Sequence, residues 1–216
     1  MRPTEQVRIH FPRPLIPNIG TQPRCRFFCY SQLRHPSPFL SYLCRVKFCY
    51  ESSITHNVMS KPILFFDMDN VLVDFQSGID RLDDATKQAY ESNLDDVPGI
   101  FALMDPMPGA IEAVHKLAEK YDVYILSTAP WKNPTALNDK LAWVKNHFGA
   151  EEGSVFYKRV IFSHHKNLCH GDYLIDDRPN KCGAGNFSGE LLHFDPKNPE
   201  ARFHSWDEVV TYLMEK

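Results

Sequence analysis

Two aspartates, Asp67 and Asp69, stand one residue apart at the end of an apolar run in the stretch ILFFDMDNVLVDF. Carboxylates this close repel each other, and they lose hydration when they are buried. A cation between them offsets both effects, and Mg²⁺ is a dication that prefers carboxylate and water oxygens in proteins. The stretch therefore predicts an acidic site for a divalent cation.

Other reactive side chains follow later apolar runs. Ser127 and Thr128 end the run DVYILST, and Asp176 and Asp177 end the run DYLIDD. Lys166 lies in the segment that precedes DYLIDD. A set of acids, hydroxyls and one amine in this order favours a phosphate site beside the cation.

The residue types allow a specific chemistry. Asp67, Asp69 and Asp177 form a set of hard oxygen ligands for Mg²⁺. Thr128 and Lys166 can hold a phosphate against it, and Ser127 is a further candidate phosphate ligand. A carboxylate beside the metal can attack phosphorus, and a second carboxyl group can protonate the leaving oxygen.

Strand-like and helix-like patterns alternate after residue 61. The expected strands are 62–67, 122–128, 155–163, 172–177 and 190–194, and the expected helices are 77–93, 108–121, 137–149 and 205–216. This alternation predicts a Rossmann-like α/β fold with a mostly parallel sheet covered on both faces. Ligands of such sheets bind at the carboxyl ends of the strands, where the acids stand.

The motifs DMDNVL, ILSTAP, Lys166 and DYLIDDRP resemble the four ordered motifs of the haloacid dehalogenase superfamily. Within it, the chain is similar to the 5'(3')-deoxyribonucleotidase family of the cytosolic type, over residues 62–180. This resemblance implies a small helical cap inserted after the first strand, at about residues 76–107. It also implies Mg²⁺-dependent hydrolysis of deoxynucleoside monophosphates through an aspartyl-phosphate.

The resemblance assigns roles to the matching positions. Asp67 is expected to be the nucleophile, and Asp69 the general acid and base whose backbone carbonyl binds Mg²⁺. Asp177 is expected to be the third metal ligand, with Asp176 behind it. The substrate contacts expected from the resemblance are Thr128, Lys166 and Phe75.

Two features depart from the family pattern. Asn70 stands where this family usually has Gly, although Asn tolerates a left-handed backbone better than most residues. Thr128 follows Asp67 by only 61 positions, so the cap is small. A small cap leaves the choice of base, sugar and phosphate position open.

Two alternatives remain beside the nucleotidase hypothesis. One is a phosphatase of the same fold that acts on a sugar phosphate or another small metabolite. The other is a non-catalytic binding module, which predicts a broken set of motifs. Dehalogenases of the superfamily lack the second acid, so Asp69 favours phosphate chemistry.

Residues 1–58 differ from the rest of the chain. They hold eight of the 24 Lys and Arg residues, two of the 27 Asp and Glu residues, and four of the six cysteines. We expect an unstructured extension, or upstream sequence joined to a gene that begins at Met59; a transit peptide and a zinc knuckle are the alternatives. Residues 59–216 then form the phosphatase domain.

Charge and cysteine content limit the partners. The net charge of −3 argues against general nucleic-acid binding. No apolar run reaches the roughly 18–20 residues that a membrane span requires. Only Cys169 and Cys182 follow Met59, which favours a reduced, cytoplasmic protein. The sequence leaves a homodimer open.

Overall fold

The computed structural model describes residues 60–216. The predictions for residues 1–58 concern a segment outside this range. Among the described residues, no helix combines the length and apolar character needed to cross a membrane.

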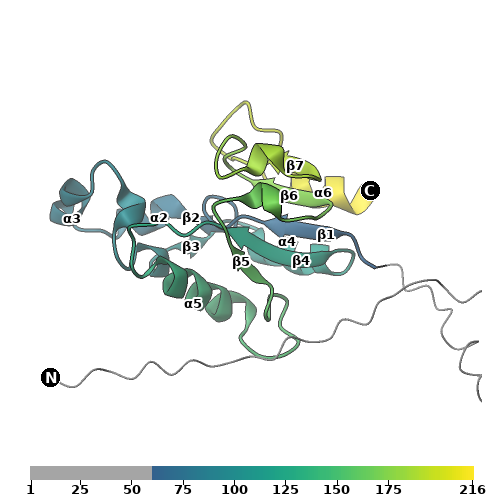
Figure 1. Ribbon diagram of the computed structural model, residues 1–216, viewed down its shortest axis with the longest axis horizontal. Helices are drawn as coiled ribbons and strands as arrows, with labels where there is room; N and C mark the ends of the chain where they lie inside the picture. Colours follow the sequence, from purple (N-terminus) through teal and green to yellow (C-terminus); the bar gives the residue numbers. More distant parts are fainter. Residues whose placement is uncertain (1–59) are drawn as a thin grey trace, which may run out of the picture. The chain divides into compact units, whose positions relative to one another are not determined.

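A five-stranded parallel sheet forms the centre of the described part (Figure 1). Its strand order is β5-β4-β1-β6-β7. The mostly parallel α/β fold expected from the sequence is therefore confirmed. The strands are β1 (Ile63–Phe66), β4 (Asp122–Ser127), β5 (Val160–Phe162), β6 (Tyr173–Asp176) and β7 (Glu190–His193).

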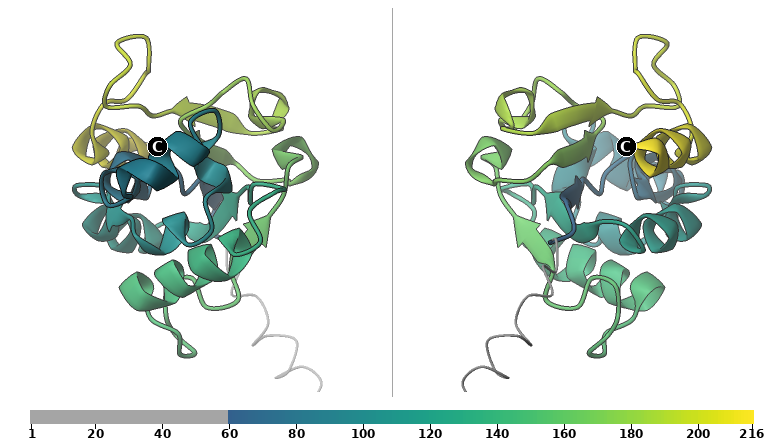
Figure 2. Two further views of the ribbon diagram at one scale, coloured as in Figure 1. Left: turned by 90° about the vertical axis from the view of Figure 1, so that its left-hand side faces the viewer. Right: turned by 90° about the vertical axis from the view of Figure 1, so that its right-hand side faces the viewer.

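The two faces of the sheet are covered differently. Leu64 and Phe66 of β1 join the large core beneath the α-helices, while Phe65 points to a smaller cluster with Leu174 and Phe187. Figure 2 shows the α-helices gathered on one side and short 3₁₀ turns on the other. The covering helices are α4 (Ala110–Ala118), α5 (Ala136–Phe148) and α6 (Trp206–Glu215), and the turns are η3 (Lys166–Leu168) and η4 (Ala184–Asn186).

The segment between β1 and α4 lies beyond the carboxyl ends of the strands, at the left of Figure 1. Its elements are short: β2 (Val73–Asp74), α2 (Phe75–Asp80), α3 (Asp84–Ala89), η1 (Leu94–Asp96), η2 (Ile100–Ala102) and β3 (Asp105–Pro106). Strands β2 and β3 pair antiparallel at the base of the segment. Strands of two residues leave no periodic signal, so the sequence did not predict them.

The single helix expected over 77–93 is wrong, because two helices occupy that stretch. The Asp83 carboxylate accepts hydrogen bonds from both Thr86 N and Thr86 Oγ1, each at 2.8 Å. This N-cap starts α3 anew and fixes a break after α2.

The strand expected over 155–163 is also too long, because only β5 is a strand. Residues before it form turns, with Lys158 at φ 57° and Tyr157 N bonded to Ser154 O. The turn buries Phe156 against Phe148, with ring centroids 4.8 Å apart. Phe156 is thus apolar because it is buried in a turn, and its presence made the stretch before β5 resemble a strand.

The smaller cluster has five buried residues, one of them Ala184 of η4, and Cys169, the residue after η3, packs against it. We expect Leu174→Ala to reduce the free energy of unfolding by about 2–5 kcal/mol, because Leu174 is fully buried there. Leu168→Ala is the matched control, since Leu168 is 70% exposed and its truncation should cost at most about 0.5 kcal/mol. Urea unfolding followed by circular dichroism measures both; equal effects would contradict the role of the cluster.

Candidate active site

The turn after β1 places the first two acids. Asp67 N donates to Ile175 O of β6 at 2.9 Å, so Asp67 continues the sheet. The chain then reverses around Met68, whose carbonyl accepts the backbone N–H groups of residues 71–73. The turn buries both carboxylates: Asp67 is 1% and Asp69 8% exposed.

Lys166 lies beneath Asp67 and is almost fully buried. Its Nζ is 3.1 Å from Asp67 Oδ1 and 2.5 Å from Asp176 Oδ2. The backbone N–H of Lys166 donates to Cys182 O, which anchors η3 to the loop after β6. The structure therefore brings together Asp67, Asp176 and Lys166 as the sequence predicts.

A second lysine, Lys140 of α5, was missed by the sequence reasoning. It is 1% exposed, and its Nζ lies 2.7 Å from both Asp69 Oδ2 and Thr128 O. A signal was present: Lys140 lies four residues after Ala136 and four before Val144, which are both buried. A lysine inside the apolar stripe of a helix requires a buried anion, because it is rarely buried unless paired.

The remaining predicted substrate residues lie at different depths. Thr128 lines a hollow beside Asp69, and Phe75 lines the same hollow from the first residue of α2. Ser127 is fully buried, and its hydroxyl lies 3.3 Å from Lys140 Nζ, outside the hollow's lining. The phosphate contact of Ser127 stays a prediction.

The hollow has a volume of about 460 Å³. Asp69, Asn70, Thr128 and Arg178 line it from the sheet side. Phe75 and residues 91–95 line it from the cap side. A cavity of this size accommodates a small organic ligand.

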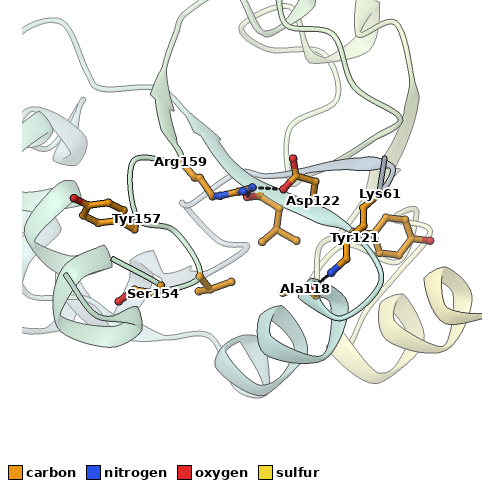
Figure 3. Close-up of a pocket in the computed structure, with 10 residues that line it drawn as sticks. Lys61, Ala118, Tyr121, Asp122, Ser154, Tyr157 and Arg159 are labelled. Atoms are coloured by element: carbon orange, nitrogen blue, oxygen red, sulfur yellow. Dashed lines mark hydrogen bonds and ion pairs between the residues drawn. The ribbon is translucent and has the colours of Figure 1, made fainter. Parts of the chain in front are cut away.

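A second hollow of about 430 Å³ lies at the amino ends of β4 and β5 (Figure 3). Its charges are paired: Arg159 bridges to Asp122, and Lys61 Nζ donates to Ala118 O at 2.8 Å. The two hollows are similar in size, so volume does not distinguish them. What distinguishes them is the set of buried side-chain atoms that lack a hydrogen-bond partner, which lie at the carboxyl ends of the strands.

Four of the five buried side-chain oxygens and nitrogens without a hydrogen-bond partner, among residues 60–216, belong to this acidic site. They are both carboxylate oxygens of Asp67, Asp69 Oδ1 and Asp177 Oδ1. Ion pairs compensate two of them in part, since Lys166 Nζ lies 3.1 Å from Asp67 Oδ1 and Arg178 Nε lies 3.5 Å from Asp177 Oδ1. Buried oxygens without a hydrogen bond are costly, so the site favours a further cation.

A divalent cation fits this requirement. One carboxylate oxygen from each of Asp67, Asp176 and Asp177 lies within 4.8 Å of the others. Asp176 is already engaged, because Oδ1 accepts from Arg178 N and Oδ2 from Lys166 Nζ. Of these three acids, Asp67 and Asp177 therefore keep oxygens that accept no hydrogen bond and are available to a divalent cation.

The electrostatics separate the first two acids. Burial opposes ionisation of Asp67, but Lys166 and Lys140 outweigh it and lower the pKa of Asp67 below its ordinary value. Burial raises the pKa of Asp69; Lys140 offsets only part of this, and the negative Asp67 adds to it. Neighbouring carboxyl groups held on opposite sides of their ordinary pKa suit a nucleophile and an acid.

Burial also governs the other two acids and the lysine. It raises the pKa of Asp177 to about 7, with Asp67 adding to the effect. It raises the pKa of Asp176 as well, although Lys166 opposes it. Burial would lower the pKa of Lys166, yet the carboxylates of Asp67 and Asp176 raise it, so Lys166 is a permanent cation.

Comparison with known proteins places the chain in a family. The sequence profile described as "5' nucleotidase, deoxy (Pyrimidine), cytosolic type C protein" matches residues 88–215. A relative in Vibrio phage KVP40, whose name proposes a 5'(3')-deoxyribonucleotidase, is 55% identical over 153 residues, which are 71% of this chain and 85% of the relative.

More distant relatives carry similar names. A Staphylococcus aureus (strain Mu50) protein is 35% identical over 123 residues, covering 55% of this chain and 64% of its own length. The mitochondrial 5'(3')-deoxyribonucleotidase of Mus musculus is 32% identical over 117 residues, covering 49% of this chain. The alignment spans about half the length of the mouse protein.

Solved structures are similar at lower identity. The HAD-hydrolase YfnB of Bacillus subtilis, bound to magnesium, is 13% identical with a TM-score of 0.48, covering 72% of this chain and 99% of that one. The haloacid dehalogenase-like protein SP0104 of Streptococcus pneumoniae is 18% identical with a TM-score of 0.46, at the same coverages.

The raised pKa of Asp177 predicts how pH and Mg²⁺ act together on stability. Without metal, the folded protein keeps a proton on Asp177 up to about pH 7, whereas the unfolded chain releases it near 3.8. The contribution of Asp177 to the free energy of unfolding of the metal-free protein therefore falls as pH rises between these values, and a bound dication counteracts the fall.

We expect Mg²⁺ to raise the melting temperature more at about pH 8 than at about pH 5.5, because only the ionised carboxylate binds it. Differential scanning fluorimetry in excess MgCl₂ and in EDTA measures the gain. Asp177→Asn should abolish most of it at the higher pH. An equal gain at both pH values would contradict the assignment of Asp177 as a ligand.

Proposed function

The chain belongs to the cytosolic type C family of 5' nucleotidases, and on this basis we propose that it is a Mg²⁺-dependent phosphatase of deoxynucleoside monophosphates. The reaction would proceed through an aspartyl-phosphate on Asp67. Asp67, Asp177 and the backbone carbonyl of Asp69 would hold the ion. Mg²⁺ supplies positive charge that offsets the repulsion between the carboxylates and an approaching phosphate.

One observation carries the proposal: the Asp67 carboxylate is buried, ionised and accepts no hydrogen bond, two residues before Asp69, which lines the polar hollow. A carboxylate with these properties has its lone pairs available for attack on phosphorus. Lys166 Nζ, 3.1 Å away, fixes its orientation and adds positive charge where the phosphate oxygens would lie.

In the first half-reaction, an Asp67 oxygen forms a bond to phosphorus as the bond to the leaving oxygen breaks. Asp69, whose pKa is raised by burial, gives its proton to that oxygen. In the second, Asp69 takes a proton from a water that attacks phosphorus, and the Asp67–phosphorus bond breaks. Phosphate leaves, and both acids return to their starting protonation states.

The hollow supports a nucleotide-sized substrate. Thr128 lies beside Asp69, so a phosphate held there would have its organic group directed toward Phe75 and residues 91–95. Phe75 packs against Phe101, with ring centroids 6.0 Å apart, and presents an aromatic wall to the hollow. Such a wall suits the apolar face of a sugar and base.

Hydrogen bonds hold the segment between β1 and α4, the expected cap, to the sheet domain. Asn133 Nδ2 donates to the carbonyls of Asp95 and Val97, at 2.9 and 2.8 Å. Trp143 Nε1 donates to Met104 O at 2.8 Å. We infer that the cap acts as a fixed wall of the hollow. The cytoplasmic location and the absence of nucleic-acid and membrane partners stay predictions.

The direct test is phosphate release from dUMP and dTMP by the full-length protein, compared with sugar phosphates. We expect nucleotide hydrolysis that requires Mg²⁺ and is lost in Asp67→Asn, because the amide is not a nucleophile. A malachite-green assay measures the phosphate. Retained activity in Asp67→Asn would reject the mechanism, and faster hydrolysis of sugar phosphates would favour the other substrate class.

The contact between Lys140 and Asp69 predicts that the loss of activity in a Lys140 variant depends on the leaving group of the substrate. Lys140→Met removes the ammonium that holds Asp69 Oδ2 at 2.7 Å but keeps most of the side chain's volume. Turnover of a deoxynucleotide, whose alkoxide must be protonated, should fall on the order of 10²-fold. The first half-reaction with p-nitrophenyl phosphate, whose phenolate leaves without a proton, should slow much less, and the initial burst of p-nitrophenolate measures it.

Asp69→Asn is the reference variant, and it should show the same selective loss. Lys140→Arg keeps the charge and should recover part of the nucleotide activity. If Lys140→Met slowed both substrates equally, Lys140 would be a structural residue with no role in positioning the acid.

A further inference from the structure

Asn70 occupies a left-handed backbone conformation, which glycine adopts most easily and Asn better than most other residues. Its φ is 58°, in the left-handed region, and it follows Asp69 in the turn around Met68. Glycine adopts this conformation without strain, whereas a side chain adds a cost. A hydrogen bond made by the Asn70 side chain can offset this conformational cost.

The Asn70 side chain contacts a carboxylate of the acidic site. Asn70 Nδ2 donates to Asp177 Oδ2 at 2.9 Å, across a separation of 107 residues. The bond engages one oxygen of Asp177 and leaves Oδ1 buried without a hydrogen bond. One carboxylate oxygen of Asp177 lies within 4.8 Å of one carboxylate oxygen of Asp67, so the two acids face a common space.

Arg178 competes for the same carboxylate. Its Nε lies 3.5 Å from Asp177 Oδ1, which is near but outside ordinary hydrogen-bond length. A guanidinium can take both oxygens of a carboxylate in a forked arrangement. With Oδ2 fixed by Asn70, Asp177 cannot rotate to give both oxygens to Arg178.

We propose that Asn70 is a positioning residue for the metal site: its amide fixes Asp177 Oδ2 so that Oδ1 is presented to Mg²⁺. The inference rests on the proposed function, because it assumes that the acidic site binds this ion. Hydrogen bonds to the distal atom of a ligand orient it, and their loss typically lowers metal affinity 10–100-fold. Asn70 therefore sets the metal affinity without touching the ion.

The test is isothermal titration of the full-length protein with MgCl₂ alone. Asn70→Gly deletes the amide and at the same time relaxes the left-handed backbone, so the fold is not endangered. We expect Kd for Mg²⁺ to rise about 10–100-fold, and the melting temperature in EDTA to stay the same or increase. A merely structural residue would show the opposite pattern.

Asn70→Ala is the matched control, because it also deletes the amide but keeps a side chain at a left-handed position. Equal losses of affinity in the two variants would assign the effect to the amide; a loss in Asn70→Ala alone would assign it to the backbone and overturn the proposal. Unchanged affinity in Asn70→Gly overturns the inference while the metal site stands. No Mg²⁺ binding by the wild-type protein overturns the proposed function itself.

Discussion

The structure depends on an imbalance of buried charge. Four carboxyl groups, Asp67, Asp69, Asp176 and Asp177, are gathered at the ends of β1 and β6, and two buried lysines, Lys140 and Lys166, face them. Burying an unpaired carboxylate costs several kcal/mol, and the two lysines together with the partly exposed Arg178 still give fewer cations than there are acids. The excess negative charge of the site is reduced if some carboxyl groups keep their protons or if a dication binds. The raised pKa of Asp177 reflects the first response, and the carboxylate oxygens that accept no hydrogen bond are available for the second.

The parallel sheet is what makes this concentration of charge possible. Strands β1 and β6 are neighbours in register, so the residues that follow them emerge side by side. The sequence allowed this convergence to be predicted, because acids directly after apolar strands have only one edge of a parallel sheet to occupy. The order of the motifs also identified Lys166, although a lone lysine carries no such information.

Other parts could not be predicted from the sequence for identifiable physical reasons. The break between α2 and α3 depends on one capping carboxylate, Asp83, inside a stretch whose apolar spacing continues. The second face of the sheet is covered by 3₁₀ turns, which have too few residues to show a period. Lys140 was overlooked because a lysine in a helix is ordinarily solvated. Only its position in the buried stripe shows otherwise.

The division of labour between Asp67 and Asp69 follows from where the two lysines lie. Both lysines favour the ionised form of Asp67: Lys166 Nζ lies 3.1 Å from its carboxylate, and the positive charge of Lys140 acts from further away. Asp69 has Lys140 at 2.7 Å but stands next to an Asp67 that is already negative. Each added negative charge makes the next ionisation harder, so the acid with more cationic support ionises first and the other keeps its proton. In the proposed mechanism, two identical side chains therefore serve as nucleophile and proton donor because their surroundings shift their pKa values in opposite directions.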